Sequence, residues 1–273
     1  MIVSNPADIA PNQSIFDPVF SVAGRTVVIT GSCGLIGREL TRAFLKRGAN
    51  VAGTDLSPLD KRPEFTSADG RLLNMVADVT NARSVIDLAR TVIDRFGRVD
   101  VLINSHHYKP KGFTEALPEE FPEELWDAIV EVNLKATFLT CREFGRAMLK
   151  QGSGSIINFA STYGVVSSNP DLYEGNTLGN PIAYSASKGG VLMLTKHLGA
   201  YWAERGVRVN CVTPHGVENS QEASFVERFS RKSPMRRLMR IDEIVGAVVF
   251  LASDASSYAT ASNLLIEGGW TAW

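Results

Sequence analysis

The sequence contains little cysteine, little net charge and no long hydrophobic run. Its 273 residues carry a formal net charge of −1 at pH 7, from 28 basic and 29 acidic side chains. This balance does not create the basic field that attracts nucleic acid or anionic membranes, so neither is an expected partner. No apolar run reaches the roughly 18 residues that a membrane-spanning helix needs.

Cysteines and metal-ligand patterns are equally sparse. The three cysteines, Cys33, Cys141 and Cys211, are odd in number and lie in apolar surroundings, which favours reduced, buried thiols over a disulfide framework. The amino-terminal segment lacks the basic start and apolar core of a secretory signal. These features predict a cytoplasmic protein. No CxxC or HExxH spacing occurs, so no metal site is expected.

Strand-like and helix-like segments alternate after a polar leader, residues 1–24. The β-branched run at 25–30 predicts a strand buried on both faces, and apolar residues at helical spacing follow it over 35–48. Further strands are expected at 50–55, 72–78, 99–105, 154–161, 207–214 and 262–269, and further helices at 85–96, 122–150 and 183–205. Residues 25–273 are therefore expected to form one α/β domain: a Rossmann-like, doubly wound parallel sheet of about seven strands, with helices on both faces.

The segment TGSCGLIG, residues 30–37, lies between the first expected strand and the first expected helix. Glycine there permits a positive φ and close backbone approach, and the helix amino terminus favours an anion. In α/β folds such a loop binds the pyrophosphate of a dinucleotide, although glycines also simply cap helices. The candidate cofactor-binding residues in it are Gly31, Ser32, Cys33, Gly34, Leu35, Ile36 and Gly37.

Polar residues end the next three expected strands. Asp55 is placed to accept hydrogen bonds from the adenosine ribose and to repel a 2′-phosphate; a turn cap is the alternative. No basic residue follows it before Lys61, which favours NAD over NADP. The third expected strand ends on ADVT, where Asp78 either meets the adenine or forms a turn. The fourth ends on LINS, where Asn104 is placed to order the backbone beside the adenosine. The candidates there are Asp78, Val79, Asn104 and Ser105.

The sequence YSASK places Tyr184 and Lys188 four residues apart, on one face of an expected helix. A phenol titrates near pH 10, so it is a poor base at neutral pH unless a neighbouring cation lowers its pKa. A tyrosine packed on a lysine stem is the alternative. Ser161 ends the fifth expected strand, at the sheet edge where open α/β folds bind ligands. These three residues are the candidate catalytic groups.

With these motifs, residues 25–270 resemble the short-chain dehydrogenase/reductase family. The similarity rests on TGSCGLIG, DVT, DVLINS, EVNL, GSIINFASTYG, YSASK, RVNCVTP, FLASD and EGGW. It implies that Ser161 orients the substrate oxygen, that Tyr184 transfers the proton, and that Lys188 binds the nicotinamide ribose and lowers the tyrosine pKa. It also implies that Asn133 supports a proton-relay water. The residues implied to lie along the nicotinamide are Pro214, Gly216 and Val217.

The chain departs from the family pattern in its loops. The glycine spacing is T-G-x-x-G-x-x-G instead of T-G-x-x-x-G-x-G, and so resembles the branch that acts on nucleotide sugars. His106 and His107 replace small residues after the fourth strand; they either cover the adenosine side or reach the substrate. Adjacent histidines without a third ligand nearby are not expected to bind a metal.

An inserted segment separates Ser161 from Tyr184. Residues 169–181 are polar and aromatic and resemble an insertion in sugar-modifying members of the family; they either cover the mouth of the site or form an ordered surface loop. The basic segment 227–240 either closes over the substrate, where its arginines would meet a phosphate, or is solvated surface. The candidate substrate-binding residues are Ser161, Tyr163, Tyr173, Glu174, Asn176, His107 and His215.

The sequence thus predicts an NAD-dependent oxidoreductase that interconverts a secondary alcohol and a ketone on a sugar, polyol or amino-sugar derivative. The sequence alone leaves two alternatives. A nucleotide-sugar epimerase or dehydratase would hold NAD tightly, and a non-catalytic sensor would bind the dinucleotide without turnover. The resemblance further implies a homotetramer or homodimer whose other partner is a small, polar, sugar-like substrate.

Overall fold

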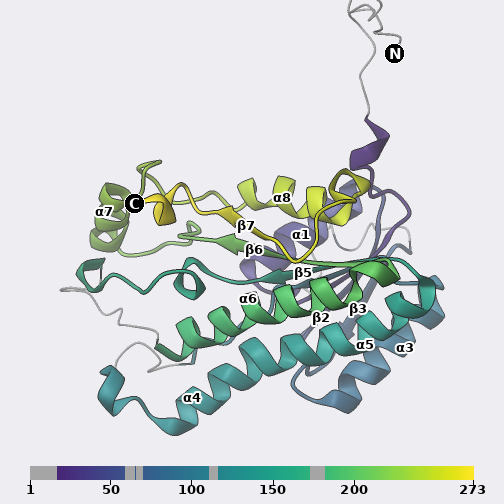
Figure 1. Ribbon diagram of the computed structural model, residues 1–273, viewed down its shortest axis with the longest axis horizontal. Helices are drawn as coiled ribbons and strands as arrows, with labels where there is room; N and C mark the ends of the chain where they lie inside the picture. Colours follow the sequence, from purple (N-terminus) through teal and green to yellow (C-terminus); the bar gives the residue numbers. More distant parts are fainter. Residues whose placement is uncertain (1–16, 59–64, 66–69, 111–115, 173–181) are drawn as a thin grey trace, which may run out of the picture.

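The protein folds around one parallel sheet. The computed structural model describes residues 17–58, 65, 70–110, 116–172 and 182–273. Within these residues seven strands pair side by side in the order β3-β2-β1-β4-β5-β6-β7, and every neighbouring pair is parallel (Figure 1). The strands are β1 (Thr26–Thr30), β2 (Asn50–Asp55), β3 (Leu72–Val76), β4 (Val101–Asn104), β5 (Gly154–Phe159), β6 (Val207–Pro214) and β7 (Asn263–Ile266).

Helices cover both faces of this sheet. On one face lie α1 (Leu35–Lys46) and α8 (Glu243–Ala252), and on the other lie α3 (Ala82–Phe96), α5 (Ala136–Gln151) and α6 (Ile182–Trp202) (Figure 1). The helix α4 (Glu123–Val130) leads into α5, and α7 (Ala223–Lys232) lies at the end of the sheet to which the strands point. No helix of the described chain is both long and apolar enough to cross a membrane.

The strand side chains alternate between two hydrophobic clusters. In β1, Val27 and Ile29 pack with α1 and α8, whereas Val28 packs with α3 and α5. In β4, Ile103 packs on the side of α1 and α8, and Leu102 packs on the side of α3 and α5. Because successive side chains of a strand point to opposite faces, a strand covered on both sides is apolar at most positions. This requirement explains the continuous β-branched runs in the sequence.

The expected strands and their alternation with helices are confirmed, but α7 and α8 were not expected, and two further details differ. The helix expected over 122–150 is interrupted by a π-helical turn, Glu131–Lys135, between α4 and α5. Cys141 and Cys211 are buried as expected, but Cys33 is only partly buried because it lies in the glycine loop at a cavity wall. The expectation that all three thiols are buried is therefore wrong for Cys33.

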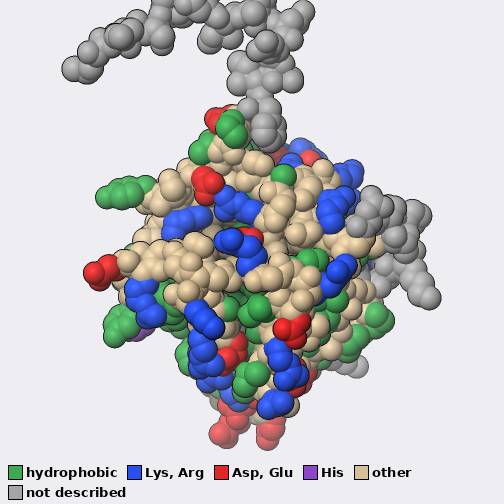
Figure 2. Space-filling view, turned by 90° about the vertical axis from the view of Figure 1, so that its right-hand side faces the viewer, with side chains coloured by type: hydrophobic (Ala, Val, Ile, Leu, Met, Phe, Trp, Pro, Cys, Tyr) green, Lys and Arg blue, Asp and Glu red, His purple; other side chains and the backbone are tan. Residues whose placement is uncertain are grey.

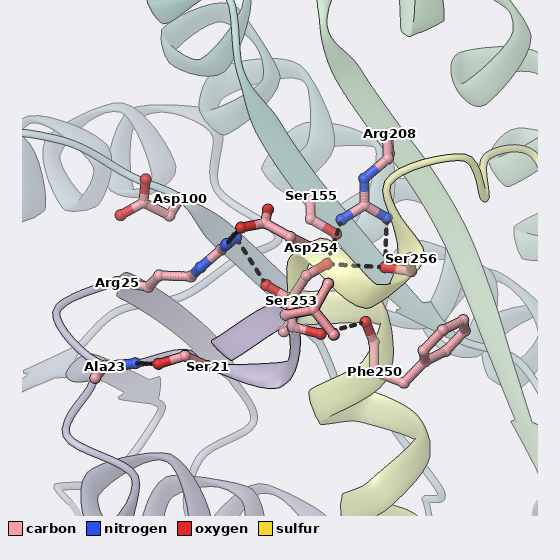
Figure 3. A network of polar contacts seen from close by, with 12 residues as sticks. Ser21, Ala23, Arg25, Asp100, Ser155, Arg208, Phe250, Ser253, Asp254 and Ser256 are labelled. Atoms are coloured by element: carbon pink, nitrogen blue, oxygen red, sulfur yellow. Dashed lines mark hydrogen bonds and ion pairs between the residues drawn. The ribbon is translucent and has the colours of Figure 1, made fainter. Parts of the chain in front are cut away.

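Two arginines close the amino-terminal edge of the sheet (Figure 3). Arg25 donates to the carbonyl of Ala252 at 3.1 Å and pairs with Asp254 at 2.7 Å. Arg208, at the start of β6, donates to the Leu251 carbonyl at 3.0 Å. Its other acceptors are the carbonyls of Ser253 and Ala259 and the hydroxyl of Ser256. Both guanidinium groups thus satisfy carbonyl groups that a helix leaves unpaired at its carboxyl end.

The surface beside this edge carries charges of both signs. Figure 2 shows the face on the right-hand side of Figure 1, where basic and acidic side chains are interspersed among neutral and hydrophobic ones. The face shown therefore presents no large patch of a single sign.

We expect Arg208→Ala to destabilise the fold by about 2–3 kcal/mol, because it removes the hydrogen bonds of a charged guanidinium group to three carbonyl oxygens and to the hydroxyl of Ser256. The measurement is the free energy of unfolding in urea. Arg205→Ala, three residues earlier and fully on the surface, serves as the matched control and should change that free energy by less than about 0.5 kcal/mol. Equal effects of the two substitutions would contradict the role assigned to Arg208.

Candidate active site

A cavity of about 950 Å³ lies at the carboxyl ends of the strands. Its walls come from the loops that follow β1, β2, β3, β4, β5 and β6, and from the first turns of α1 and α6. The strand order reverses at β1 and β4, and open α/β sheets bind ligands at such a switch point. The topology therefore gathers the predicted site residues from distant parts of the chain into one place.

The glycine loop after β1 forms one end of the cavity. Gly31 has φ +70°, and a Cβ there would lie 2.7 Å from the Cα of His106. A Cβ on Gly37 would lie 2.1 Å from the carbonyl oxygen of Gly31, so neither position accepts a side chain without moving the backbone. Gly34 precedes α1 and supplies no side-chain cap, which leaves the amide groups of the first helical turn for an anion. This cradle fits the pyrophosphate of a dinucleotide.

Six of the seven predicted loop residues line the cavity: Gly31, Cys33, Gly34, Leu35, Ile36 and Gly37. Ser32 does not. Its side chain is fully buried against Gly53 in β2, beneath the loop, because the turn at Gly31 directs it into the sheet. The side chain of Ser32 therefore does not reach the cavity, and the predicted contact of this residue with the cofactor stays a prediction.

Asp55 lies at the cavity wall at the end of β2, as predicted. Its carboxylate accepts hydrogen bonds from the amide of Cys33 at 3.0 Å and from the amide of Leu56 at 2.8 Å. These bonds hold a negative charge beside the glycine loop. Asp78 and Val79 also line the cavity, and the Asp78 carboxylate is held by the amide and hydroxyl of Thr80, at 2.9 and 2.7 Å.

The two residues predicted at the end of β4, Asn104 and Ser105, point in different directions. Ser105 lines the cavity, and its hydroxyl donates to the carbonyl of Thr30 at 2.6 Å. Asn104 points the other way, into the interior, where its amide donates to Asn158 of β5 at 2.9 Å and its carbonyl accepts from Thr140 of α5 at 2.8 Å. Alternation along β4 places this side chain behind the cavity wall, and the role predicted for Asn104, to order the backbone beside the adenosine, stays a prediction.

The three candidate catalytic residues meet at the middle of the cavity. Ser161 follows β5, and Tyr184 and Lys188 lie on one face of α6. Tyr184 and Ser161 are hydrogen-bonded through their side chains. The Lys188 ammonium lies 5.7 Å from the centre of the Tyr184 ring and donates to the carbonyl of Phe159 at 2.7 Å. This arrangement fits a phenol that exchanges a proton with a bound hydroxyl or carbonyl group.

Electrostatics lower the pKa of Tyr184. Desolvation by burial raises this pKa. The positive charges of Lys188 and Lys109, together with the hydrogen bond from Ser161, lower it by a larger amount, so that the net shift is downward. Burial lowers the pKa of Lys188, and the charge of Tyr184 opposes that shift. The phenolate is therefore easier to form here than in water.

Lys109 is not among the site residues predicted from the sequence. Its ammonium lies 5.3 Å from the centre of the Tyr184 ring, and its side chain lines the cavity. Lys109 lies five residues after the end of β4, in SHHYKPK. The only sequence signal was a basic residue shortly after a strand at the ligand-binding edge.

Asn133 lies behind the cavity wall. It is fully buried in the π-helical turn, where its side-chain oxygen accepts from the amide of Tyr108 at 2.7 Å and its side-chain nitrogen donates to the hydroxyl of Ser187 at 3.3 Å. It thereby links the loop that carries Lys109 to the helix that carries Lys188. Its side chain holds these two elements together and does not line the cavity.

The histidines have different surroundings. His106 is buried at the cavity wall between the hydroxyls of Thr30, at 2.6 Å, and Thr137, at 3.3 Å, and desolvation lowers its pKa to about 3. His215 bonds the hydroxyl of Thr162 at 2.5 Å and packs edge-on against Trp270. Desolvation lowers the pKa of His215 to about 3 as well. Both rings are therefore neutral at physiological pH.

Several other predicted residues line the cavity: His107, Tyr163, Pro214, Gly216 and Val217. Tyr173, Glu174 and Asn176 lie outside the described residues. The basic segment 227–240 meets acidic partners through Arg231–Glu227, Lys232–Asp171, Arg237–Glu243 and Arg240–Asp242. These pairs favour the solvated-surface interpretation of that segment. In the described residues no cluster of three or more acidic, histidine or cysteine side chains could hold a metal ion.

Known proteins resemble this chain along most of its length. A family model described as "Enoyl-(Acyl carrier protein) reductase" matches residues 34–271. A D-threitol dehydrogenase of Mycolicibacterium smegmatis is 34% identical over 263 residues, which cover 92% of this chain and 95% of that protein. Two solved structures superpose closely. A short-chain dehydrogenase from Leptospira borgpetersenii with bound NAD+ has a TM-score of 0.84 and 30% identity, and the match covers 99% of this chain and 97% of that one. A gluconate 5-dehydrogenase from Burkholderia cenocepacia in complex with NADP and tartrate has a TM-score of 0.81 and 28% identity, with coverages of 94% and 98%.

We expect Gly37→Ala to weaken the binding of NADH at least about tenfold, because the added methyl group forces the loop backbone away from its present path. A fluorescence titration with NADH measures the dissociation constant. Gly246→Ala in α8, where a Cβ meets nothing within 4 Å, is the matched control and should leave the dissociation constant unchanged. Wild-type affinity in Gly37→Ala would refute the assignment of this loop.

Proposed function

The chain belongs to the short-chain dehydrogenase/reductase family, and from this premise we propose that it is an NAD-dependent oxidoreductase that interconverts a secondary alcohol and a ketone on a polyol, sugar or amino-sugar derivative. The observation that carries the proposal is the position of Tyr184. Its phenol lies beside Ser161 and Lys188, in the cavity that begins at the glycine loop. A substrate carbinol beside this phenol would lie within reach of a nicotinamide extending from the loop.

The proposed oxidation removes a hydride and a proton from the carbinol group and transfers them to two different acceptors. A nicotinamide bound in this cavity would accept the carbinol hydrogen as a hydride. Tyr184, as the phenolate, takes the hydroxyl proton, so that the carbon–oxygen bond becomes a carbonyl. Ser161 donates a hydrogen bond to the substrate oxygen and holds it against the phenol. Lys188 stabilises the phenolate by its charge. Ketone reduction reverses these steps, with the neutral phenol as the proton donor.

The substrate class is inferred from the cavity and from similarity. The wall near Tyr184 carries Ser161, Tyr163 and His107, which suit a ligand with several hydroxyl groups better than an acyl chain. The similar protein named D-threitol dehydrogenase and the one named gluconate 5-dehydrogenase point to short polyhydroxy compounds. A small, polar, sugar-like alcohol is therefore the substrate that we propose.

Asp55 supports NAD as the preferred cofactor. The family uses NAD or NADP: the similar structure from Leptospira borgpetersenii contains NAD+, and the one from Burkholderia cenocepacia contains NADP. The Asp55 carboxylate faces the cavity beside the glycine loop, where it can accept hydrogen bonds from ribose hydroxyls and would repel a 2′-phosphate.

We also propose that the chain self-associates as a homotetramer or homodimer. Trp126 of α4, Phe138 of α5 and Met193 of α6 are exposed on the helical layer that covers one face of the sheet. Large apolar side chains grouped on exposed helices are typical of subunit interfaces. Sedimentation of the purified protein would determine the state.

We expect Tyr184→Phe to lower kcat about 10²- to 10⁴-fold, because the variant cannot take the hydroxyl proton. The measurement follows the near-ultraviolet absorbance of NADH with a panel of polyols, sugars, sugar acids, sugar phosphates and nucleotide sugars. Tyr201→Phe, an exposed tyrosine on the same helix, is the control and should retain wild-type rates. Turnover that survives in Tyr184→Phe would argue against this chemistry. If the wild type binds NADH but turns over nothing, the epimerase-like and sensor alternatives gain weight.

We expect Asp55→Ser to raise the ratio of kcat/KM with NADP to kcat/KM with NAD at least about tenfold, which corresponds to about 1.4 kcal/mol of removed repulsion and lost ribose bonding. Steady-state kinetics with both cofactors measure the ratio. Asp94→Asn removes an acidic group from the exposed face of α3 and should not change it. An unaltered ratio in Asp55→Ser would mean that another group sets the cofactor preference.

A further inference from the structure

Lys109 is a cation in the cavity wall without an acidic partner in the described chain. Its side chain is exposed to the cavity, and its ammonium lies 5.3 Å from the centre of the Tyr184 ring. Among the described residues that line this cavity, Lys109 and Lys188 are the only lysine or arginine side chains. Lys188 is buried and donates to the carbonyl of Phe159, so its position is set by the protein. No carboxylate of the described residues holds Lys109 in a comparable way.

The acidic side chains of the cavity wall form hydrogen bonds or ion pairs with groups other than Lys109. Asp55 accepts from the amides of the glycine loop and of its own strand end, and Asp78 accepts from Thr80. Glu131 pairs with Lys135 at 2.8 Å. None of these three carboxylates forms an ion pair with Lys109. The charge of Lys109 is thus not balanced by the described part of the wall.

Two lysines flank one phenol at this point. When Tyr184 is neutral, the ammonium groups of Lys109 and Lys188 leave two positive charges around its ring, at 5.3 and 5.7 Å from the ring centre. A substrate that enters displaces water from these charges, and a desolvated cation is costly unless an anion accompanies it. The reacting end of the cavity therefore favours a ligand with a negative group close to its carbinol.

We propose that Lys109 binds a carboxylate of the substrate, so that the preferred substrates are hydroxy acids of the aldonate type and not neutral polyols. This inference rests on the proposed alcohol oxidation and narrows its substrate class. A carboxylate suits a single ammonium group, whereas phosphate sites usually include the fork of an arginine, and no arginine is among the described residues of this wall.

The test compares matched pairs of substrates. Four- to six-carbon polyols and the aldonates of the same configuration differ only in one terminal carbon, CH₂OH or carboxylate. We expect at least one aldonate to have a kcat/KM at least tenfold above its polyol in the wild type. Lys109→Met should reduce this acid-to-polyol ratio at least tenfold, mainly through KM of the acid, and Lys109→Arg should preserve it. Lys196→Met removes an exposed lysine from α6 and should leave the ratio unchanged.

A pH profile separates substrate binding from the influence of Lys109 on Tyr184. Since Lys109 contributes to the lowered pKa of Tyr184, Lys109→Met should move the rising limb of the oxidation rate to higher pH with both substrates of a pair. The ratio is therefore compared on the plateau above that limb, where the phenolate is fully formed. A loss of equal size for acid and polyol on the plateau would overturn carboxylate binding by Lys109.

A binding measurement keeps this inference distinct from the proposed function. Calorimetric titration with the same aldonates should give dissociation constants at least tenfold weaker for Lys109→Met than for the wild type. Oxidation of polyols without any preference for acids would overturn the inference and leave the proposed function standing. Absence of turnover with every compound would overturn the proposed function, and the titration would then still decide whether Lys109 binds the carboxylate.

Discussion

The structure depends on the burial of both faces of one parallel sheet. Because α1 and α8 cover one face and α3, α5 and α6 cover the other, neither face of the central strands is left to bind a polar ligand. Parallel pairing brings the carboxyl ends of all strands to a single edge, and the connecting loops meet there. The cavity is a consequence of this arrangement. The opposite edge is closed by Arg25 and Arg208, which satisfy the carbonyl groups at the end of α8.

A buried polar network positions the cavity wall from behind. Asn104 of β4 donates to Asn158 of β5 at 2.9 Å, and Asn158 donates to Thr195 of α6 at 3.0 Å. Asn133 joins the π-helical turn to the Tyr108 loop and, through Ser187, to α6. Hydrogen bonds in a low-dielectric interior are costly to leave incomplete, so these contacts fix the register of α6 against the sheet. The helix that carries Tyr184 and Lys188 is thereby held in one orientation.

The chemistry of the site follows from its charges. Tyr184 lies between two ammonium groups, and His106 and His215 remain neutral because they are buried. Neutral imidazoles add hydrogen-bonding groups and apolar surface without further positive charge. The lowered pKa of the phenol, and a Lys109 ammonium that pairs with no carboxylate of the described residues, are thus two effects of one local excess of positive charge. The first bears on proton transfer, and the second bears on the choice of substrate.

The sequence by itself determined the seven strands, their order, the helices up to α6 and the loops that line the cavity, because alternating burial and helical periodicity are local properties of a chain. It did not predict α7 or α8. It also identified Asp55, Ser161, Tyr184 and Lys188 by their places at strand ends or on one helix face. Only the tertiary structure decided which side chains face the cavity. Ser32 and Asn104 turn away from it, Asn133 lies behind it, and Lys109 enters it. These orientations depend on packing between segments far apart in the chain, such as β4 with β5 and the π-helical turn with α6, and no local pattern records such contacts.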